Sequence, residues 1–222
     1  MNFIVQLETD FNKISNPKII ESWEKYMKNN FKFLGVITET RREILKRNSI
    51  NFEEEIKNNF REISCKLFNK QEREFHYCGQ EILYKYINKN FKKDDILLIE
   101  KMITTNSWWD SVDFIAKNIL GNYVLAFPDE KYNVIEKFSN SANMWLNRSA
   151  IIFQLSYKKN TDFELLISEC ERHKTSKEFF IQKAIGWALR DYSRFNPNGV
   201  QAYVNATNLM PLSKREALRK II

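Results

Sequence analysis

Glycine and proline are scarce in this chain of 222 residues, which has five glycines and four prolines. Architectures built from strands and tight turns need many more of these turn-forming residues. Lysine, glutamate and leucine, which favour helices, are common instead. The composition therefore predicts a nearly all-α protein.

Histidine and cysteine are also few, with two histidines and three cysteines. His76 and His173 do not have the spacing of a zinc site, and Cys65, Cys78 and Cys170 lie too far apart for a metal knuckle. We therefore expect neither a metal nor a cofactor. An odd number of widely separated cysteines fits a reduced, cytoplasmic setting.

Long apolar runs are missing as well. No stretch approaches the roughly 20 apolar residues of a membrane span, and the N-terminus lacks a signal-peptide pattern. The chain contains no glycine-rich phosphate loop and no nucleophile elbow. These absences argue against a membrane partner and exclude most familiar enzyme classes.

Positive charge is in excess, with a formal net charge of +7. Such a balance favours a polyanionic partner, nucleic acid first, although a basic surface without a specific partner is the alternative. The hydrophobic fraction of 43% suffices for one sizeable core or for a stack of small cores. Because no composition break divides the chain, we expect a single domain over residues 1–222.

Apolar spacing and capping residues predict many helices of modest length joined by short loops. We expect Gly121 to end the helix before it, and Ser213 and Glu216 to form a capping box. A loop over residues 29–36, punctuated by Gly35, should follow the second helix. One predicted helix starts at Pro17 after the cap Asn16, another starts at Thr38, and a short one precedes Pro128. The other predicted helices cover residues 3–13, 51–66, 70–88, 94–103, 108–120, 129–138, 144–157, 162–171, 176–195, 197–205 and 213–222.

Three helix starts recur at similar spacing. The capping positions Ser107, Asn143 and Ser176 lie 36 and then 33 residues apart. Helix-pair repeats have periods of about 33 to 47 residues. The spacing favours a solenoid in which the second helices of successive pairs line one concave wall, whereas a globular bundle is the alternative.

The sequence Ser-Trp-Trp-Asp-Ser-Val-Asp, which starts at Ser107, is the most informative stretch. Ser107 and Asp110 match a capping pair, so that Trp108 would be the first helical residue. Asp110 would then lie in the first turn, where the helix dipole favours a carboxylate. Asp113 lies four residues after Trp109, which places an indole and a carboxylate on one helix face. An ordinary cap with core contacts is the structural alternative.

Cationic and aromatic residues on later helices complete a possible site. Arg148 lies at the edge of an apolar stripe, and Lys183, Trp187 and Arg190 share a helix face through spacings of four and three. Arginines bind phosphates in a fork, and indole faces attract cations and stack on sugars or bases. Phosphates would repel a carboxylate among such groups, so its presence there has to be explained. Stabilisation of positive charge on a ligand is the explanation we favour. Taken singly, Arg148 would be a surface ion-pair residue, Trp187 a core residue and Asp113 a solvated helix residue.

These stretches together resemble the AlkD-type DNA alkylation repair glycosylases, over about residues 26–222, with 49–75 poorly matched. The motifs that carry the resemblance are Tyr26-Met27-Lys28-Asn29, Phe33-Leu34-Gly35, Arg41-Arg42, Ser107-Trp108-Trp109-Asp110-Ser111-Val112-Asp113, Trp145-Leu146-x-Arg148, the run from Ser176-Lys177-Glu178-Phe179 through Phe180-Ile181-Gln182-Lys183 to Ala184-Ile185-Gly186-Trp187, Leu189-Arg190 and Pro211-Leu212-Ser213-Lys214-Arg215-Glu216-Ala217.

The resemblance implies an all-α, HEAT-like solenoid, a right-handed superhelix of helix pairs whose basic concave face holds duplex DNA. It implies a monomeric enzyme that removes cationic purines alkylated at N3 or N7, such as 3-methyladenine and 7-methylguanine, without a base pocket. It places the catalytic carboxylate on Asp113, two sugar-facing indoles on Trp109 and Trp187, and a backbone-contacting arginine on Arg148.

Four further residues are candidates for contacts with the DNA, namely Tyr26, Arg42, Lys183 and Arg190. Ser156 is a departure, because the resemblance leads us to expect a lysine there, so that one phosphate contact would be weaker or would come from Lys158 or Lys159. A non-catalytic HEAT-like protein that binds distorted or branched DNA is the alternative, and a scaffold for acidic proteins is a third. The presence of Trp109, Asp113, Arg148 and Trp187 together favours the enzyme.

Overall fold

The computed structural model describes residues 2–221, and helices dominate it. Within these residues no strand forms, and one isolated parallel bridge joins Lys32 to Glu72. None of the described helices is both long enough and apolar enough to cross a bilayer. The all-α, helical-repeat prediction is confirmed. The chain divides into two compact units, one up to Asn90 and one from Phe91 onward, which are described separately.

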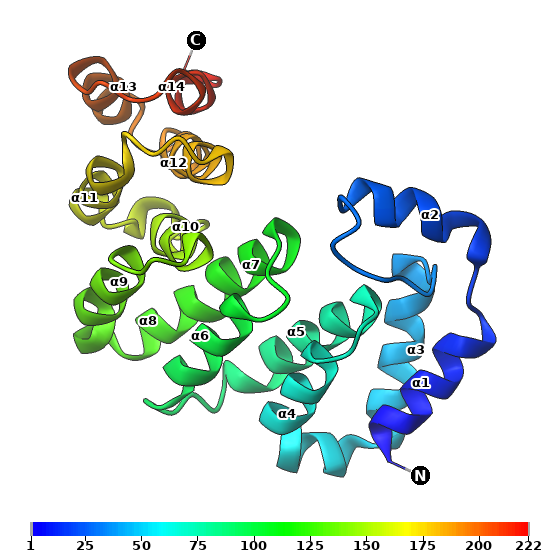
Figure 1. Cartoon of the computed structure of the whole chain (residues 1–222). Helices are drawn as coiled ribbons and strands as arrows, with labels where there is room; N and C mark the ends of the chain where they lie inside the picture. Colours follow the sequence, from blue (N-terminus) through cyan, green and yellow to red (C-terminus); the bar gives the residue numbers. More distant parts are fainter. Residues whose placement is uncertain (1, 222) are drawn as a thin grey trace. The chain divides into compact units, whose positions relative to one another are not determined.

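The described residues of the first unit form the helices α1 to α5 (Figure 1), and Asn16 caps α2 by accepting a hydrogen bond from the Lys18 amide, as predicted. The helices are α1 (Phe3–Lys13), α2 (Pro17–Tyr26), α3 (Thr38–Asn51), α4 (Glu53–Phe68) and α5 (Arg73–Ile87). Phe3, Leu7 and Phe11 bury one face of α1 completely. The helix starts at Pro17 and Thr38 therefore agree with the sequence prediction.

The loop after α2 is held by a buried carboxylate. Glu74 accepts hydrogen bonds from the backbone amides of Leu34, Gly35 and Val36 at 2.9 to 3.2 Å. Gly35 has a φ of +77°, a conformation that glycine adopts without steric cost. The predicted punctuation of this loop by Gly35 is confirmed, and the loop fixes the path of the chain after Tyr26.

The second unit repeats a helix-pair pattern. Its elements are α6 (Asp95–Thr104), α7 (Trp109–Ile115), a π-helical turn (Ala116–Leu120), α8 (Gly121–Ala126), a 3₁₀ turn (Pro128–Glu130), α9 (Lys131–Ser139), α10 (Met144–Ile152), a 3₁₀ turn (Lys158–Asn160), α11 (Phe163–His173), α12 (Phe179–Tyr192), α13 (Pro197–Ala206) and α14 (Pro211–Leu218). The starts of α7, α10 and α12, at residues 109, 144 and 179, are 35 residues apart.

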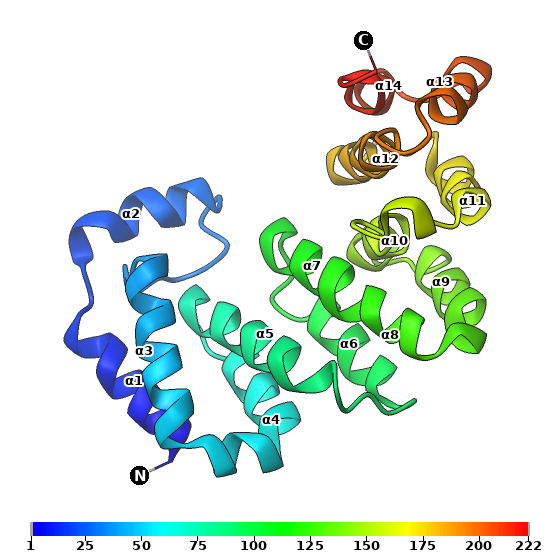
Figure 2. The same cartoon turned by 180° about the vertical axis from the view of Figure 1, so that it is seen from behind.

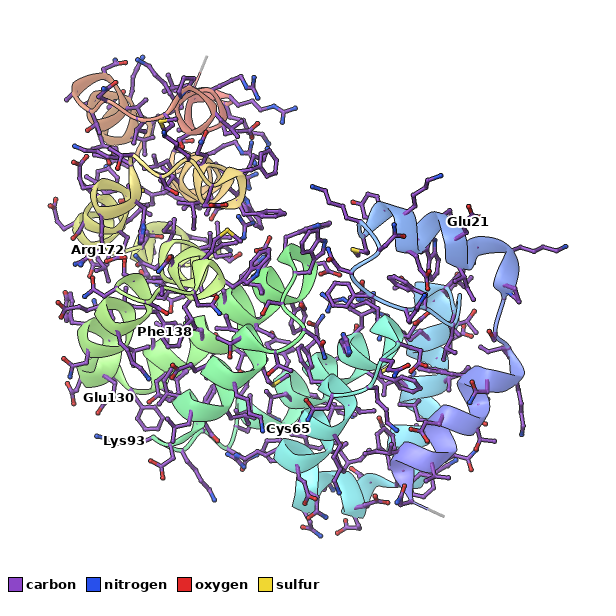
Figure 3. All side chains as sticks on the ribbon, in the orientation of Figure 1. Glu21, Cys65, Lys93, Glu130, Phe138 and Arg172 are labelled. Atoms are coloured by element: carbon purple, nitrogen blue, oxygen red, sulfur yellow. The ribbon has the colours of Figure 1, made fainter. Side chains whose placement is uncertain are left out.

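Within the second unit, Figures 1 and 2 show two layers, with α9, α11 and α13 on one side and α10, α12 and α14 on the other. Buried residues such as Ile151, Ile185 and Val200 form a core cluster of this unit. Phe138 of α9, labelled in Figure 3, is also fully buried. The layer of α10, α12 and α14, together with α7, carries the candidate site.

The start of α7 differs from the prediction. Trp108, in an extended conformation, precedes the first helical residue, Trp109, and no side chain caps this helix. The Ser107 hydroxyl instead donates to the Ile103 carbonyl, one of the unsatisfied acceptors at the end of α6. The predicted capping pair is therefore wrong, although Asp110 does lie in the first turn.

Gly121 does not end a helix. Its backbone is right-handed helical, and the chain continues through the π-helical turn into α8. A Cβ at this position would lie 2.7 Å from the Phe153 carbonyl oxygen. Glycine is present because two backbone segments approach closely, which the sequence signal does not distinguish from a helix stop.

Two further boundaries are corrected. α10 ends at Ile152 instead of residue 157, and Ser156 beyond it has a φ of +77°. α14 begins at Pro211, so Ser213 lies inside the helix and donates its hydroxyl to the Gln182 carbonyl instead of forming a capping box. Ile222, included in the predicted last helix, lies outside the described residues. The other ranges agree within three residues at each end.

Candidate active site

Asp113 of α7 and Arg148 of α10 form a two-pronged ion pair. The Arg148 Nε donates to Asp113 Oδ1 at 2.7 Å, and Nη2 donates to Oδ2 at 2.8 Å. Only 5% of the Arg148 side chain and 14% of the Asp113 side chain are exposed. The Arg148 Nη1 donates to the Phe180 carbonyl of α12. One guanidinium thus joins three neighbouring helices of the second unit, a pairing that the sequence prediction missed.

The loop before α10 fixes where Arg148 lies. The Asn143 side chain caps α10 by accepting from the Trp145 amide at 2.9 Å. The Asn147 side-chain amide donates to the carbonyls of Phe138, Ser139 and Ser141. These bonds satisfy backbone acceptors at the end of α9 and just beyond it, and they set the rotation of the helix that carries Arg148.

The protonation of Asp113 is governed by two opposing effects. Burial raises the pKa of Asp113, the hydrogen bonds and charge of Arg148 lower it, and the neighbouring Asp110 raises it slightly. The net direction is upward from the ordinary value of 3.8. The fork with a guanidinium is the geometry of an ionised carboxylate. The site therefore holds a poorly solvated negative charge.

Trp109 and Trp187, the two predicted sugar-facing indoles, are both half-buried. Trp109 begins α7, one turn before Asp113. Trp187 lies on α12, which packs directly against α10, and one side of it meets the core cluster. The structure thus places both indoles on helices adjoining the ion pair.

An aromatic cluster lies next to the Arg148 guanidinium. Trp108, Trp145 and Phe180 pack on one another with ring centroids 5.0 to 5.9 Å apart. Trp108 is half-buried, and its buried Nε1 has no hydrogen-bond partner among the described residues. The sequence prediction missed Phe180. The recurrence of an aromatic residue at three successive helix starts is the signal that could have found this cluster.

Lys183 and Arg190 of α12 share one partner on α14. Lys183 Nζ lies 3.1 Å from Glu216 Oε1, and Arg190 Nη1 lies 2.7 Å from Oε2. The hydrogen bond from Lys183, and then Arg190, depress the pKa of Glu216. A Cβ on Gly186 would lie 2.4 Å from the Glu216 Cβ, so glycine permits this approach of α14. The shared face predicted for Lys183 and Arg190 is confirmed, and Glu216 is the residue that sequence reasoning assigned to a different role.

Tyr26 and Arg42 belong to the first unit. Tyr26, the last residue of α2, is 69% exposed and lines a hollow of about 190 Å³ together with Trp23 and Tyr77. The Arg42 side chain is 65% exposed, and its Nε donates to Glu81 at 3.2 Å. Both side chains are therefore at the surface of that unit, as a contact with DNA requires.

Ser156, where the resemblance led us to expect a lysine, lies in the exposed turn after α10. Its backbone amide donates to Asp191 Oδ2 at 3.1 Å. Lys158 and Lys159 are exposed in the same turn, and Lys158 also has a positive φ. The turn keeps two cations close to the position where the serine stands.

The histidines and cysteines have structural contacts. The His76 ring lies between Arg73 and the Lys70 carbonyl, and His173 contacts the Ser139 hydroxyl. None of the three cysteines, all of which the structure describes, belongs to a disulfide, and burial raises the pKa of Cys78 to about 12. Within the described part of the chain, no group of three His, Cys, Asp or Glu side chains is placed to hold a metal ion.

Comparisons with known proteins concern the family and the fold of the chain. The sequence profile of the family described as DNA alkylation repair enzyme matches residues 7–221. A solved structure titled as a predicted DNA alkylation repair enzyme from Enterococcus faecalis is 29% identical and has a TM-score of 0.83, over 93% of this chain and 96% of that one.

A second solved structure, smu.31 from Streptococcus mutans UA159, is 15% identical and has a TM-score of 0.60, over 83% of this chain and 98% of that one. That likeness concerns the fold alone. No curated protein sequence gives a significant match.

Proposed function

Because the chain belongs to the DNA alkylation repair enzyme family, we propose that it is a DNA glycosylase for purines made cationic by alkylation at N3 or N7. The single observation that carries this proposal is the mostly buried Asp113 carboxylate, held by Arg148 between helices that also carry Trp109 and Trp187. A poorly solvated carboxylate is suited to stabilising positive charge that develops on a ligand.

The reaction breaks the bond between the sugar C1′ and the purine nitrogen, and the electron pair leaves with the base. A purine that is already cationic departs as a neutral molecule, so no general acid is needed. Positive charge then develops on the deoxyribose, where an ionised Asp113 stabilises it. Water adds to C1′ and loses its proton, which Asp113 is able to accept.

The indoles of Trp109 and Trp187 would lie against the sugar. Their negative ring faces attract the developing cation, which adds to the effect of the carboxylate. A surface that acts on the sugar leaves the base outside the protein, so bulky adducts are tolerated and neutral lesions are ignored.

Arg148 takes a positioning role in this proposal. Three of its five N–H donors are directed at Asp113 and at the Phe180 carbonyl. They fix the carboxylate in one orientation and keep it ionised. The two remaining N–H groups are the ones that would meet a phosphate of the DNA backbone.

The proposed partner is duplex DNA containing alkylated bases, bound by a monomer in the cytoplasm. The net charge of +7 favours such a polyanion. Tyr26 and Arg42 in the first unit, and Lys183 and Arg190 in the second, are the proposed contacts.

A non-catalytic protein that binds distorted or branched DNA is the second candidate. The observation in its favour is that Asp113 is already neutralised by Arg148, as a purely structural ion pair would be. In that protein the same cations would bind DNA, and the carboxylate would have no chemical role.

One incubation separates the two candidates. The purified protein is mixed in excess with a duplex carrying a single 7-methylguanine, and abasic sites are scored over time. Release above the spontaneous rate, with loss of release in Asp113→Asn, supports the enzyme. A duplex carrying uracil or hypoxanthine should give no release, because neither base is cationic. Tight binding without release supports the second candidate.

A further inference from the structure

A hollow of about 360 Å³ opens in the second unit beside Trp187. It lies between the last turn of α12 and the residues that follow α14. We name it the C-terminal cationic pocket. Its lining residues are Trp187, Arg190, Asp191, Arg194, Arg219 and Lys220.

Positive charge in this pocket is only partly balanced by the residues that the structure describes. Asp191, its one carboxylate, accepts a hydrogen bond from the Ser156 amide, and Arg190 is paired with Glu216. Arg194, Arg219 and Lys220 are exposed, and no ion pair or side-chain hydrogen bond joins them to another described residue. Three like charges around one hollow repel each other unless an anion enters.

Helix dipoles explain only part of this arrangement. Arg194 lies just beyond the end of α12, and Arg219 and Lys220 lie just beyond Leu218 of α14. A cation at the C-terminal end of a helix is favoured individually. The dipole does not explain why cations from the ends of two helices surround the same hollow. Binding of an anionic ligand in that hollow does explain it.

We propose that the C-terminal cationic pocket binds a backbone phosphate and its adjoining sugar, on the nucleic-acid strand that passes Trp187. Guanidinium groups bind phosphate oxygens in a fork, and the Trp187 ring offers an apolar wall to a sugar. A volume of about 360 Å³ far exceeds the roughly 30 Å³ of a single water, which suits a phosphate with its sugar better than an isolated ion.

This inference rests on the proposed function only for the identity of the ligand as DNA, and it does not require catalysis. The pocket adds Arg194, Arg219 and Lys220 to the proposed DNA-contacting residues. Its place next to Trp187 means that it would hold the strand near the reacting sugar.

The test compares two variants that each lose two positive charges. Arg194→Ala/Arg219→Ala empties the pocket of two guanidinium groups, whereas Arg172→Ala/Lys174→Ala removes cations associated with α11, in the other layer. Arg172, labelled in Figure 3, is held by Asn140, and Lys174 by Glu171. Affinity for an undamaged duplex is measured from low to moderate salt, and thermal melting shows that each variant is folded.

We expect the pocket variant to lose several-fold or more in affinity at moderate salt. Its log–log salt slope should become shallower by about 0.9 for each lost phosphate contact. The α11 variant should keep the wild-type slope. Equal losses in the two variants would show a diffuse charge effect and overturn the pocket.

Inorganic phosphate and a nucleoside monophosphate form a second arm, added at constant ionic strength while tryptophan fluorescence is followed. Saturation by either at micromolar concentration, without competition from DNA, would make a free phosphate the ligand and overturn the backbone assignment. Competition with DNA in the millimolar range supports the assignment. Failure of the wild-type protein to release 7-methylguanine would instead contradict the proposed catalysis while leaving this binding test intact.

Discussion

The guanidinium of Arg148 donates a hydrogen bond to each oxygen of the Asp113 carboxylate, at 2.7 and 2.8 Å, and little solvent reaches either group. Removing one member of such a pair leaves the other charge buried without compensation. A single substitution at either position therefore changes both stability and chemistry. The two effects have to be separated before the carboxylate is assigned a catalytic role.

A double-mutant cycle separates them. Asp113→Asn and Arg148→Gln should each lower the free energy of unfolding by about 3 kcal/mol, the lower end for a broken buried pair. The double variant should recover much of this loss, because neither charge remains. Excision of 7-methylguanine should fall by roughly 10²–10³ in every variant that lacks Asp113. Thermal melting and single-turnover rates measure the two quantities, and recovery of excision in the double variant would contradict the electrostatic role.

Asp110→Asn is the matched control for the carboxylate. Asp110 lies in the first turn of α7, where its charge interacts with the helix dipole. The substitution should lower stability by about 0.3–1 kcal/mol and leave the single-turnover rate nearly unchanged. If this variant loses excision and Asp113→Asn keeps it, the roles of the two carboxylates are reversed.

Excision should decline on the acid side at a higher pH than an ordinary aspartate would give. Burial raises the pKa of Asp113, and the reaction needs the ionised form. Protonation on lowering the pH therefore removes the stabilising charge. In Arg148→Gln the pKa should rise further, because the lowering effect of the guanidinium is lost. Single-turnover pH profiles, corrected for spontaneous depurination, measure the acid-side decline of the wild type and of Arg148→Gln. A decline that moves to lower pH in Arg148→Gln would refute this account.

Helix existence was predictable here because apolar spacing and caps act locally. Asn16, Asn143 and Asp162 all cap helices where the sequence indicated a start. Errors arose where a side chain had two possible backbone partners. The Ser107 hydroxyl donates to a carbonyl of the preceding helix, α6, and the Ser213 hydroxyl donates to a carbonyl of the neighbouring helix, α12. Only the folded chain shows which acceptor is close enough.

The sequence predicted which kinds of residue form the candidate site, but it did not predict which of them pair with one another. The sequence indicated one carboxylate, two indoles and several cations on neighbouring helices. It did not show that Arg148 faces Asp113 or that Lys183 and Arg190 share Glu216. Those pairings depend on the rotation of one helix against the next, which side-chain volumes at the interface set. Glu216 was predicted to form half of a capping box because it lies three residues after Ser213.

Gly121→Ala should destabilise the second unit. Alanine would improve local helix propensity by about 1 kcal/mol. Its Cβ, however, would lie 2.7 Å from the Phe153 carbonyl oxygen, and overpacking typically costs about 1–3 kcal/mol. The melting temperature should therefore fall. The exposed Leu125 of α8 is the control, since Leu125→Ala should have little effect. An increase in the melting temperature of Gly121→Ala would mean that the glycine merely weakens the helix.

Glu216→Gln should strengthen DNA binding while weakening the fold. The carboxylate neutralises Lys183 and Arg190, so its removal frees two cations for phosphates. The log–log salt slope should steepen by about 0.9 for each additional phosphate engaged. Affinity for an undamaged duplex between low and moderate salt measures this gain, and Glu164→Gln, at an exposed position of α11, is the control that also removes one carboxylate.

The stability change has a defined pH dependence. The folded-state pKa of Glu216 is depressed, so its carboxylate contributes stability above the ordinary value of 4.5 and loses it as the pH falls through the folded value. Glu216→Gln should therefore melt below the wild type at neutral pH, and the difference should shrink as the pH falls below about 4.5. If DNA affinity instead drops in a variant that is still folded, Glu216 holds the two cations in their binding positions, and the carboxylate is not a competitor of phosphate.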